Sequence, residues 1–554
     1  MRITGLFNEN RLWVALGVAT TLVVLLPLAA VVAGAMSGTD DAWDHVTSTL
    51  LPRYATGTLL LVSMTAVLAS LIGVSAAWAV TVYRFPGRRT LAWALLLPLA
   101  LPPYLVAYAL TDLMDFGGPI HELVHGTLIG ESWPRSGIRS AYGAVLVLTL
   151  SLYPYVYVAA RQSFIATAFY TRSVARSLGR GPLYSFFVIA LPLAAPAVIG
   201  GTLLVVMETA GDFGVADYFA VDTLSTGVYR AWLSLDSTVS AARISVLLLL
   251  GVIAFAATAG AIRRRTATPF SAASHPVPPT PLGPLAGGLV STLCAAPPAM
   301  GFLVPLLLFV VQAADTNRGV LLSATRGTAT LALISATVAL VLGVVHAYAH
   351  RLSRQRRTRL AMSIALLGYG IPGTVISVGL LGPLSMLDHV LSASGVSQLI
   401  GGDSSALLLT GSLFAVVLGC QTRFLAISAT TVRASFQRVR RSFDEAARTL
   451  GNGATRTLLR VHLPLTHRGV AIAGLLVFID VCKELPMTLL LRPFNFETLA
   501  VRVYQLASDE RLEEASGAAL VLAAVGVAPV LLLVRLIQDQ PSGESNAPKA
   551  ATHA

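Results

Sequence analysis

Four acidic residues and one lysine interrupt two long apolar stretches of the sequence at matching positions. Glu208 and Asp212 close one stretch, and 272 residues further on Asp480 and Glu484 stand at the equivalent places, with Lys483 beside them. A charged side chain in the hydrocarbon core of a bilayer costs several kcal/mol unless it is paired or in contact with water. These residues are therefore candidates for a polar substrate route, and their hard carboxylate oxygens suit a hard cation such as Fe3+.

The same residues also have a structural interpretation, in which the acids make hydrogen bonds between helices or one acid pairs with Lys483. In a cation route, the fixed charge of Lys483 would repel a bare metal ion. Lys483 would then either pair with an acid or meet an anion that accompanies the metal. The residues alone leave these alternatives open, and they define no metal-ligand set.

A second pattern with chemical potential is His121-Glu122-Leu-Val-His125. It fits H-E-x-x-H, in which two histidines one helical turn apart bind zinc and the glutamate acts as a base. The segment is a short connection between apolar stretches, too short for a protease cleft, and no third ligand is evident. We interpret it as a surface helix or a chance match, with metal sensing or a metal funnel as the alternative.

The setting of these residues is a membrane. The chain has 554 residues, of which 55% are hydrophobic and 12% charged, and a helix needs about 20 apolar residues to cross a bilayer core. Its formal net charge of +12 does not indicate nucleic acid binding, because the basic residues punctuate apolar runs. The sequence predicts an all-α polytopic membrane protein with twelve spans near 12–36, 56–82, 91–114, 141–165, 193–213, 239–262, 285–312, 326–350, 360–387, 405–432, 467–491 and 513–537.

The two halves of the chain resemble each other. Gly57-Thr58 matches Gly327-Thr328 and Pro102 matches Pro372 at an offset of 270 residues, while Arg161 matches Arg433 at an offset of 272. Equal topology in both halves predicts two parallel six-helix repeats, related by an axis along the membrane normal. The predicted domains are a first repeat (1–265), a proline-rich cytoplasmic linker (266–284), a second repeat (285–537) and a cytoplasmic tail (538–554).

One polar phrase occurs in both halves. Ala175-Arg-Ser-Leu-Gly179 and Ala447-Arg-Thr-Leu-Gly451 are each separated by eleven residues from a following Leu-Pro-Leu. The glycine suits a left-handed cap that ends one short helix and turns the chain into another. Each pair of short helices would project from the membrane as a compact knob. Two such knobs predict docking of a partner with two matching faces. Basic residues such as Arg84, Arg263 and Arg351 place both knobs and both termini in the cytoplasm, since positive charge stays on that side.

Here the sequence resembles a known family. The repeated phrase is similar to the EAA loop of ABC importer permeases, and the second copy, from Asp444 to Gly451, is the fuller match because Ser173 replaces the glutamate in the first. The resemblance implies a fused permease of the type I (MetI-like) fold, with EAA loops near 166–192 and 438–466. It also implies ATPase-coupling roles for Ala175, Gly179, Glu445, Ala447 and Gly451.

Four further stretches are similar to ferric-iron importer permeases. They are Tyr153–Tyr157, the segment from Glu208 through Asp212 to Gly214, Lys483–Thr488, and Leu491–Arg511. The resemblance implies a bacterial inner-membrane permease for ferric iron, supplied by an extracytoplasmic binding protein. Related fused permeases carry thiamine and other solutes, so another substrate is the alternative.

The ATPase that supplies energy for transport must be a separate protein. A phosphate-binding P-loop needs Gly-Lys-Ser/Thr, and the only two lysines, Lys483 and Lys549, follow Cys482 and Pro548. We therefore expect no ATPase activity and no cofactor in this chain, with ATP and Mg bound by two copies of a cytoplasmic ATPase, one for each loop. A proton-driven transporter with twelve spans is the remaining alternative. The loop Tyr83–Arg89 resembles a basic loop of such carriers but lacks the acid expected before its arginines.

Overall fold

The computed structural model describes residues 2–38, 40–114, 118, 138–177, 179–266, 279–313, 317–353, 355–394 and 408–538. Within these residues, eleven helices are long and apolar enough to cross a membrane, and a bent pair of helices makes up to twelve. The protein is therefore an all-α polytopic membrane protein, as predicted. His121, Glu122 and His125 lie outside the described residues.

The first half contains these elements in order: α1 (Arg2–Met36), α2 (Asp41–His45), η1 (Val46–Leu50), α3 (Leu51–Val82), β1 (Tyr83–Arg84), α4 (Arg88–Ala94), η2 (Leu97–Ala100), α5 (Pro103–Met114), α7 (Ala141–Ser177), α8 (Pro182–Tyr184), η4 (Ser185–Ala190), α9 (Leu191–Gly211), α10 (Gly214–Tyr218), α11 (Leu224–Leu233) and α12 (Thr238–Thr266). Strand β1 pairs in parallel with β2 (Thr280–Pro281), which lies in the predicted linker.

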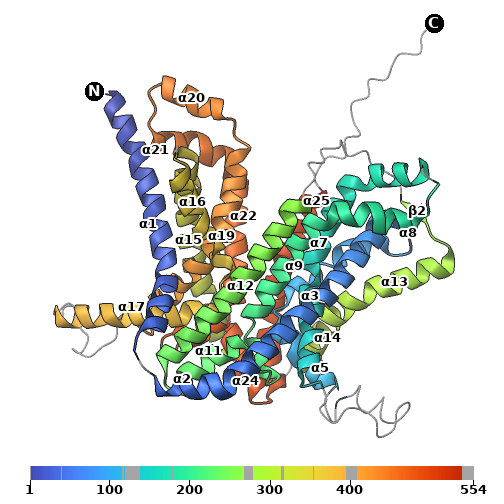
Figure 1. Ribbon diagram of the computed structural model, residues 1–554, viewed down its shortest axis with the longest axis horizontal. Helices are drawn as coiled ribbons and strands as arrows, with labels where there is room; N and C mark the ends of the chain where they lie inside the picture. The colour runs from blue at the N-terminus through green and yellow to red at the C-terminus, as the bar shows by residue number, and fades with distance from the viewer. Residues whose placement is uncertain are drawn as a thin grey trace.

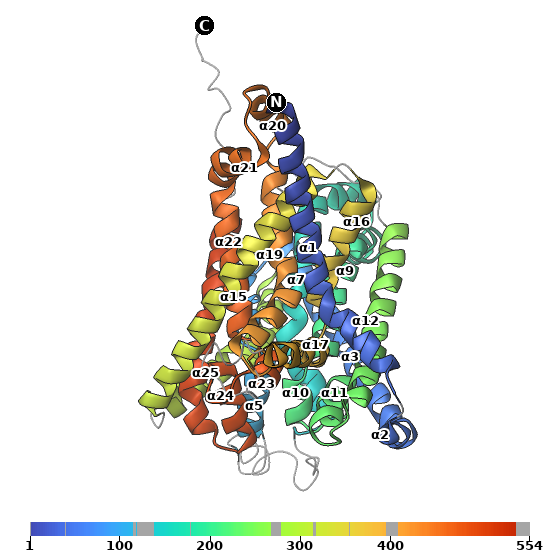
Figure 2. The ribbon, with the colours of Figure 1, turned by 90° about the vertical axis from the view of Figure 1, so that its left-hand side faces the viewer.

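The second half contains α13 (Pro284–Pro298), η5 (Ala299–Leu303), α14 (Val304–Gln312), α15 (Arg318–Leu352), α16 (Arg356–Ala365), η7 (Leu366–Gly370), α17 (Gly373–Ala393), α19 (Leu413–Gln437), α20 (Arg441–Thr449), α21 (Ala454–Thr457), η8 (Leu458–His462), α22 (Leu463–Cys482), α23 (Pro486–Leu491), α24 (Leu499–Ser508) and α25 (Leu512–Gln538). The amino terminus lies at the end of the molecule that carries α20 and α21 (Figures 1 and 2).

Three of the predicted spans are broken. One of them is 467–491, where α22 ends at Cys482 and α23 begins at Pro486, and the other two breaks are related by the repeat. The stretch 91–114 is bent by 96° between η2 and α5, and in the stretch 360–387 the helix stops at Ile371 and restarts as α17. Helix α17 runs across the long helices in Figure 1 and is seen almost end-on in Figure 2. Pro102 and Pro372 stand at the two repeat-related breaks, where a proline ring and its missing N–H interrupt a helix. The prediction of continuous helices is wrong at all three places.

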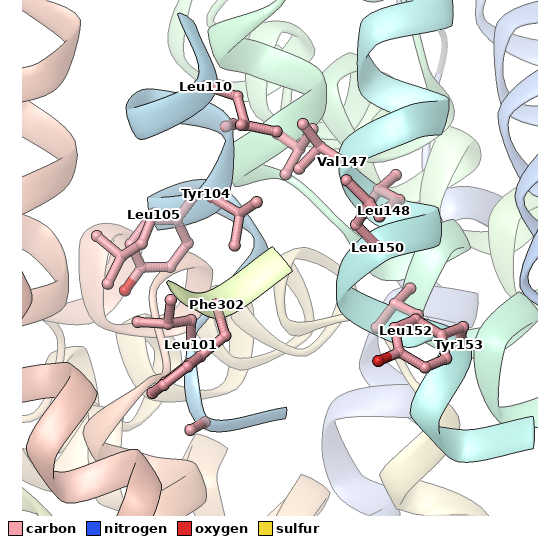
Figure 3. Packing of buried hydrophobic residues seen from close by; sticks show 14 of the residues in the cluster. Leu101, Tyr104, Leu105, Leu110, Val147, Leu148, Leu150, Leu152, Tyr153 and Phe302 are labelled. Carbon is pink, nitrogen blue, oxygen red and sulfur yellow. The ribbon is translucent and has the colours of Figure 1, made fainter. Parts of the chain in front are cut away.

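The first helices of the two halves are exchanged. Helix α1 packs against α15, α16 and α17 of the second half, and α13 packs against α4 of the first half. Figure 1 shows α1 beside the second-half helices on one side of the molecule and α13 on the other. In Figure 3, Phe302 of η5 joins a core cluster with Leu101, Tyr104 and Leu152 of the first half. The halves are therefore interlocked, which hydrophobic spacing alone does not encode.

Equivalent contacts hold a short helix against a long helix in each half. The Thr58 hydroxyl accepts a hydrogen bond of 2.8 Å from the Leu224 N–H at the start of α11. The Thr328 hydroxyl accepts one of 2.7 Å from Leu499 N–H at the start of α24. The preceding residue is glycine in both cases, because a Cβ on Gly327 would overlap the Glu497 carbonyl oxygen. The repeated Gly-Thr pair is thus a docking point for these short helices.

Replacement of Gly327 by alanine should therefore destabilise the protein. The methyl group cannot fit without moving the backbone before α24, and overpacking of this kind costs about 1–3 kcal/mol. We expect a lower melting temperature in detergent for Gly327→Ala. Gly200→Ala is the matched control, since no atom lies within 4 Å of its added methyl group. Equal melting temperatures for the two variants would contradict this account of the docking point.

Candidate functional site

A charged cavity lies where the broken helices of both halves meet. It encloses about 280 Å3 and is lined by all five residues that the sequence singled out as a route, namely Glu208, Asp212, Asp480, Lys483 and Glu484. Its apolar wall includes Leu101 and Tyr104 near α5 and Leu148 and Leu152 on α7 (Figure 3). The structure therefore brings the predicted residues together, although whether substrate passes between them stays a prediction.

Two of the acids cap short helices. Helix α9 ends at Gly211, and the Asp212 carboxylate accepts hydrogen bonds from Val215 N–H (2.9 Å) and Ala216 N–H (3.2 Å) in α10. In the second half α22 ends at Cys482, and the Glu484 carboxylate accepts one from Met487 N–H (3.1 Å) in α23. A carboxylate at this position satisfies backbone donors that have no partner within the helix. Both acids are held in place by the backbone of their own half.

Arg423 in α19 joins the two halves of the cavity. One guanidinium nitrogen lies 3.3 Å from a Glu208 oxygen, and another lies 3.1 Å from a Glu484 oxygen. These side chains are 15%, 22% and 3% exposed for Arg423, Glu208 and Glu484 respectively. Arg423 was not among the residues predicted from the sequence. Its signal was an arginine well inside the apolar stretch 405–432.

Lys483 has a different partner from the one that its sequence position suggested. Its ammonium group donates a hydrogen bond of 2.8 Å to the Leu99 carbonyl oxygen. Among the described residues, no carboxylate forms an ion pair with Lys483 within 4.0 Å, and Arg423 makes the buried ion pairs instead. The ammonium group of Lys483 lies at the cavity wall, where it attracts the Asp480 carboxylate without forming an ion pair with it.

The described part of the chain contains no group of three or more histidine, cysteine or acidic side chains arranged to hold a metal ion. Glu208 and Glu484 are engaged by Arg423, and Asp212 is engaged by backbone N–H groups. Chemically, the arrangement offers carboxylates and cations to a solute in passage. It does not present a ready-made chelating site.

The second coupling loop has the expected form. Helix α20 is followed by Gly451 at a φ of 75° and then by α21. Glu445 is exposed on α20, whereas Ala447 is buried. Two short helices joined at a left-handed glycine were predicted, and the structure has them here. The role of these residues in ATPase coupling stays a prediction.

The first coupling loop differs from the prediction. Gly179 also has a positive φ, of 63°, but Ala175 lies within α7, which continues from the span to Ser177 without a separate short helix. In the second half, Arg351 donates hydrogen bonds to the Phe436 (2.6 Å) and Val439 (3.0 Å) carbonyl oxygens after the span, where the chain turns. The repeat-related residue in the first half is Thr81, whose short side chain offers no such donors.

A buried ion-pair network anchors α20. The Asp444 carboxylate lies 2.6 Å from an Arg351 guanidinium nitrogen and 2.6 Å from the His462 Nε2. Burial raises the pKa of the Asp444 carboxyl, but hydrogen bonds from His462 and Arg351 outweigh this effect and leave the pKa below its ordinary value of 3.8. The repeat-related residues of the first half are Thr81, Arg172 and Ala190, so this network belongs to the second loop only.

These observations define a class of protein: a multi-pass membrane protein of two interlocked halves that surround a charged cavity. The family described as the inner membrane component of binding-protein-dependent transport systems matches residues 339–540. The molybdenum transport permease ModB of Escherichia coli K12 is 34% identical over 185 residues, which cover 33% of this chain and 73% of ModB. The chain belongs to this family of ABC importer permeases.

Two further relatives show the range of the family. The Fe(3+)-transport system permease FbpB 2 of Haemophilus influenzae is 22% identical over 504 residues, covering 87% of this chain and 90% of the relative. The sulfate transport permease CysT of Salmonella typhimurium is 28% identical over 203 residues, covering 36% of this chain and 70% of CysT. The similarity to FbpB 2 extends over both halves, which fits a fused permease.

Replacing Asp444 by asparagine should loosen α20. The change weakens charge-assisted hydrogen bonds to Arg351 and His462, and such bonds contribute about 1.5–3 kcal/mol each. We expect faster hydrogen exchange in α20, with Glu445→Gln as the control on an exposed neighbour. Because the Asp444 pKa is depressed, the anchor should be complete above pH 3.8 and be lost as the pH falls through the lower folded-state pKa. Unchanged exchange in Asp444→Asn would show that the network does not hold α20.

The left-handed glycines give a sharper test of the coupling loops. A β-branched residue at Gly179 is strained by about 1 kcal/mol or more because of its positive φ. Gly181→Val is the matched control, since Gly181 has a φ of −74° and open space around it. We expect Gly179→Val, and still more Gly451→Val, to separate ATP hydrolysis from transport in the assembled importer. Normal coupling in the double variant would contradict a docking role.

Proposed function

We propose that this chain is the permease of a ferric iron importer. The observation that carries the proposal is the charge of the cavity. Glu208, Asp212, Asp480 and Glu484 supply four formal negative charges, and Arg423 and Lys483 supply two positive charges, which leaves a formal charge of −2. In surroundings of low dielectric constant such an excess attracts a cation strongly. The similarity to FbpB 2 along most of the chain supports the same substrate.

An oxyanion is the second candidate substrate. It is favoured by the relatives named for molybdenum and sulfate transport and by the ammonium group of Lys483 at the cavity wall. A doubly charged oxyanion would, however, enter a cavity that already carries more negative than positive charge. We therefore place it second.

The rest of the importer follows from the family. An extracytoplasmic binding protein delivers the iron, and a cytoplasmic ATPase, which holds ATP and Mg, supplies the energy. We propose that the chain lies in the inner membrane of a bacterium. We further propose that it binds two ATPase subunits, one at each coupling loop. The amino terminus lies at the same end of the molecule as α20 and α21 (Figure 1), which supports our placing the amino terminus and the second loop together on the cytoplasmic side.

Uptake by cells with and without this chain tests the substrate. We expect the chain to increase uptake of radioactive ferric iron and to leave the uptake of sulfate and molybdate unchanged. Asp480→Asn should then reduce iron uptake severalfold with little loss of thermal stability, since the Asp480 side chain makes no hydrogen bond or ion pair with a described residue. Glu513→Gln, on the exposed surface of α25, is the control. Uptake of sulfate or molybdate without iron would establish the oxyanion candidate instead.

A further inference from the structure

The charged cavity is built from repeat-related positions, but the two halves of the chain contribute different charges to it. At the offset of 272 residues, Glu208 corresponds to Asp480 and Asp212 to Glu484, so both halves keep two acids. Arg423 corresponds to Ser151 and Lys483 to Gly211, and all four of these residues line the cavity. The second half therefore supplies both cations, and the first half supplies only negative charge.

Arg423 uses its charge to connect the halves. Its guanidinium group pairs with Glu208 of the first half and with Glu484 of its own half, at 3.3 Å and 3.1 Å. The Tyr369 and Phe424 rings lie 6.0 Å and 5.7 Å from its central carbon and add cation–π attraction. A planar guanidinium can reach two carboxylates in different directions at once, which the single ammonium group of a lysine does less well.

Other polar atoms of the same cavity have no partner. The hydroxyl groups of Ser151 and Tyr104 are buried, and within the described part of the chain they make no hydrogen bond. The Nε of Arg423 is likewise without a partner there. Buried polar atoms are normally hydrogen-bonded, and a polar occupant of the cavity, such as a hydrated ion, would satisfy these atoms.

We propose that Arg423 is an electrostatic latch of the transport route. In this structure its positive charge lies between Glu208 and Glu484, where a transported cation would be attracted by the same two carboxylates. A cation of higher charge competes with the guanidinium for them, and its entry breaks the link between Arg423 and the first half. The route is closed while the latch is paired and opens when it is displaced. The displacement step rests on the proposed function, because it requires a cationic cargo.

The latch is tested by ion leak through the isolated permease. Purified full-length chain is reconstituted into liposomes that contain a thallium-sensitive dye, without ATPase or binding protein, and entry of thallium ions is recorded. We expect severalfold faster entry for Arg423→Gln than for the wild type, and an intermediate rate for Arg423→Lys. Arg511→Gln is the matched control, because it removes an arginine from an exposed arginine–glutamate pair outside the cavity and should leak like the wild type.

A second variant separates a latch from a purely structural ion pair. Arg423→Gln leaves Glu208 and Glu484 without their partner and lowers stability, whereas the double variant Arg423→Gln with Glu208→Gln also removes one of the uncompensated charges. We expect the double variant to regain thermal stability and still to leak. A leak that disappears when stability returns would overturn the latch. Wild-type rates in both variants would also overturn it.

The outcome is independent of the substrate assignment. Thallium entry requires only an open route, whereas iron uptake by the complete importer requires the proposed substrate. If both variants leak and cells take up sulfate, Arg423 is still a latch, but a cationic cargo does not displace it. If the wild type takes up iron and neither variant leaks, the substrate assignment stands and the proposed latch role of Arg423 is wrong.

Discussion

The need to satisfy buried backbone groups at the helix breaks is the constraint on which the rest of this structure depends. Helices α9 and α22 end beside the charged cavity, and the new helices α10 and α23 begin there, among buried residues, with N–H groups that have no partner in the helix. Water is scarce there, so the groups must be satisfied by the protein. Asp212 and Glu484 do this with their carboxylates. The helix breaks therefore bring two acids into the charged cavity.

Buried acids create the next requirement. Glu484 is almost fully buried and Glu208 is mostly buried, and an uncompensated carboxylate in such surroundings is strongly destabilising. Arg423 compensates both of them and at the same time ties the first half to the second. Backbone geometry, cavity charge and the link between the halves thus form one causal sequence. A change at any step alters the others.

Much of this arrangement could be predicted from the sequence. The cavity acids stood out because charge is rare in apolar stretches, and Gly179 and Gly451 stood out because a repeated phrase ended at each of them. Arg423 does not stand out in the sequence, because a span is recognised by the hydrophobic content of the whole stretch. The exchange of α1 and α13 and the anchor of Asp444 depend on residues far apart in the chain. Local periodicity contains no information about such partners.

The asymmetry of the halves has a consequence for selectivity. Within the second half, the charges of Asp480 and Glu484 are balanced by Arg423 and Lys483, so the negative excess of the cavity comes from Glu208 and Asp212 of the first half. Ser151 and Gly211 stand where the second half has its cations. Cations at those two positions would make the cavity formally neutral. The scaffold is shared by relatives named for different solutes, and the sign of the cavity in this chain depends on the residues that its first half places there.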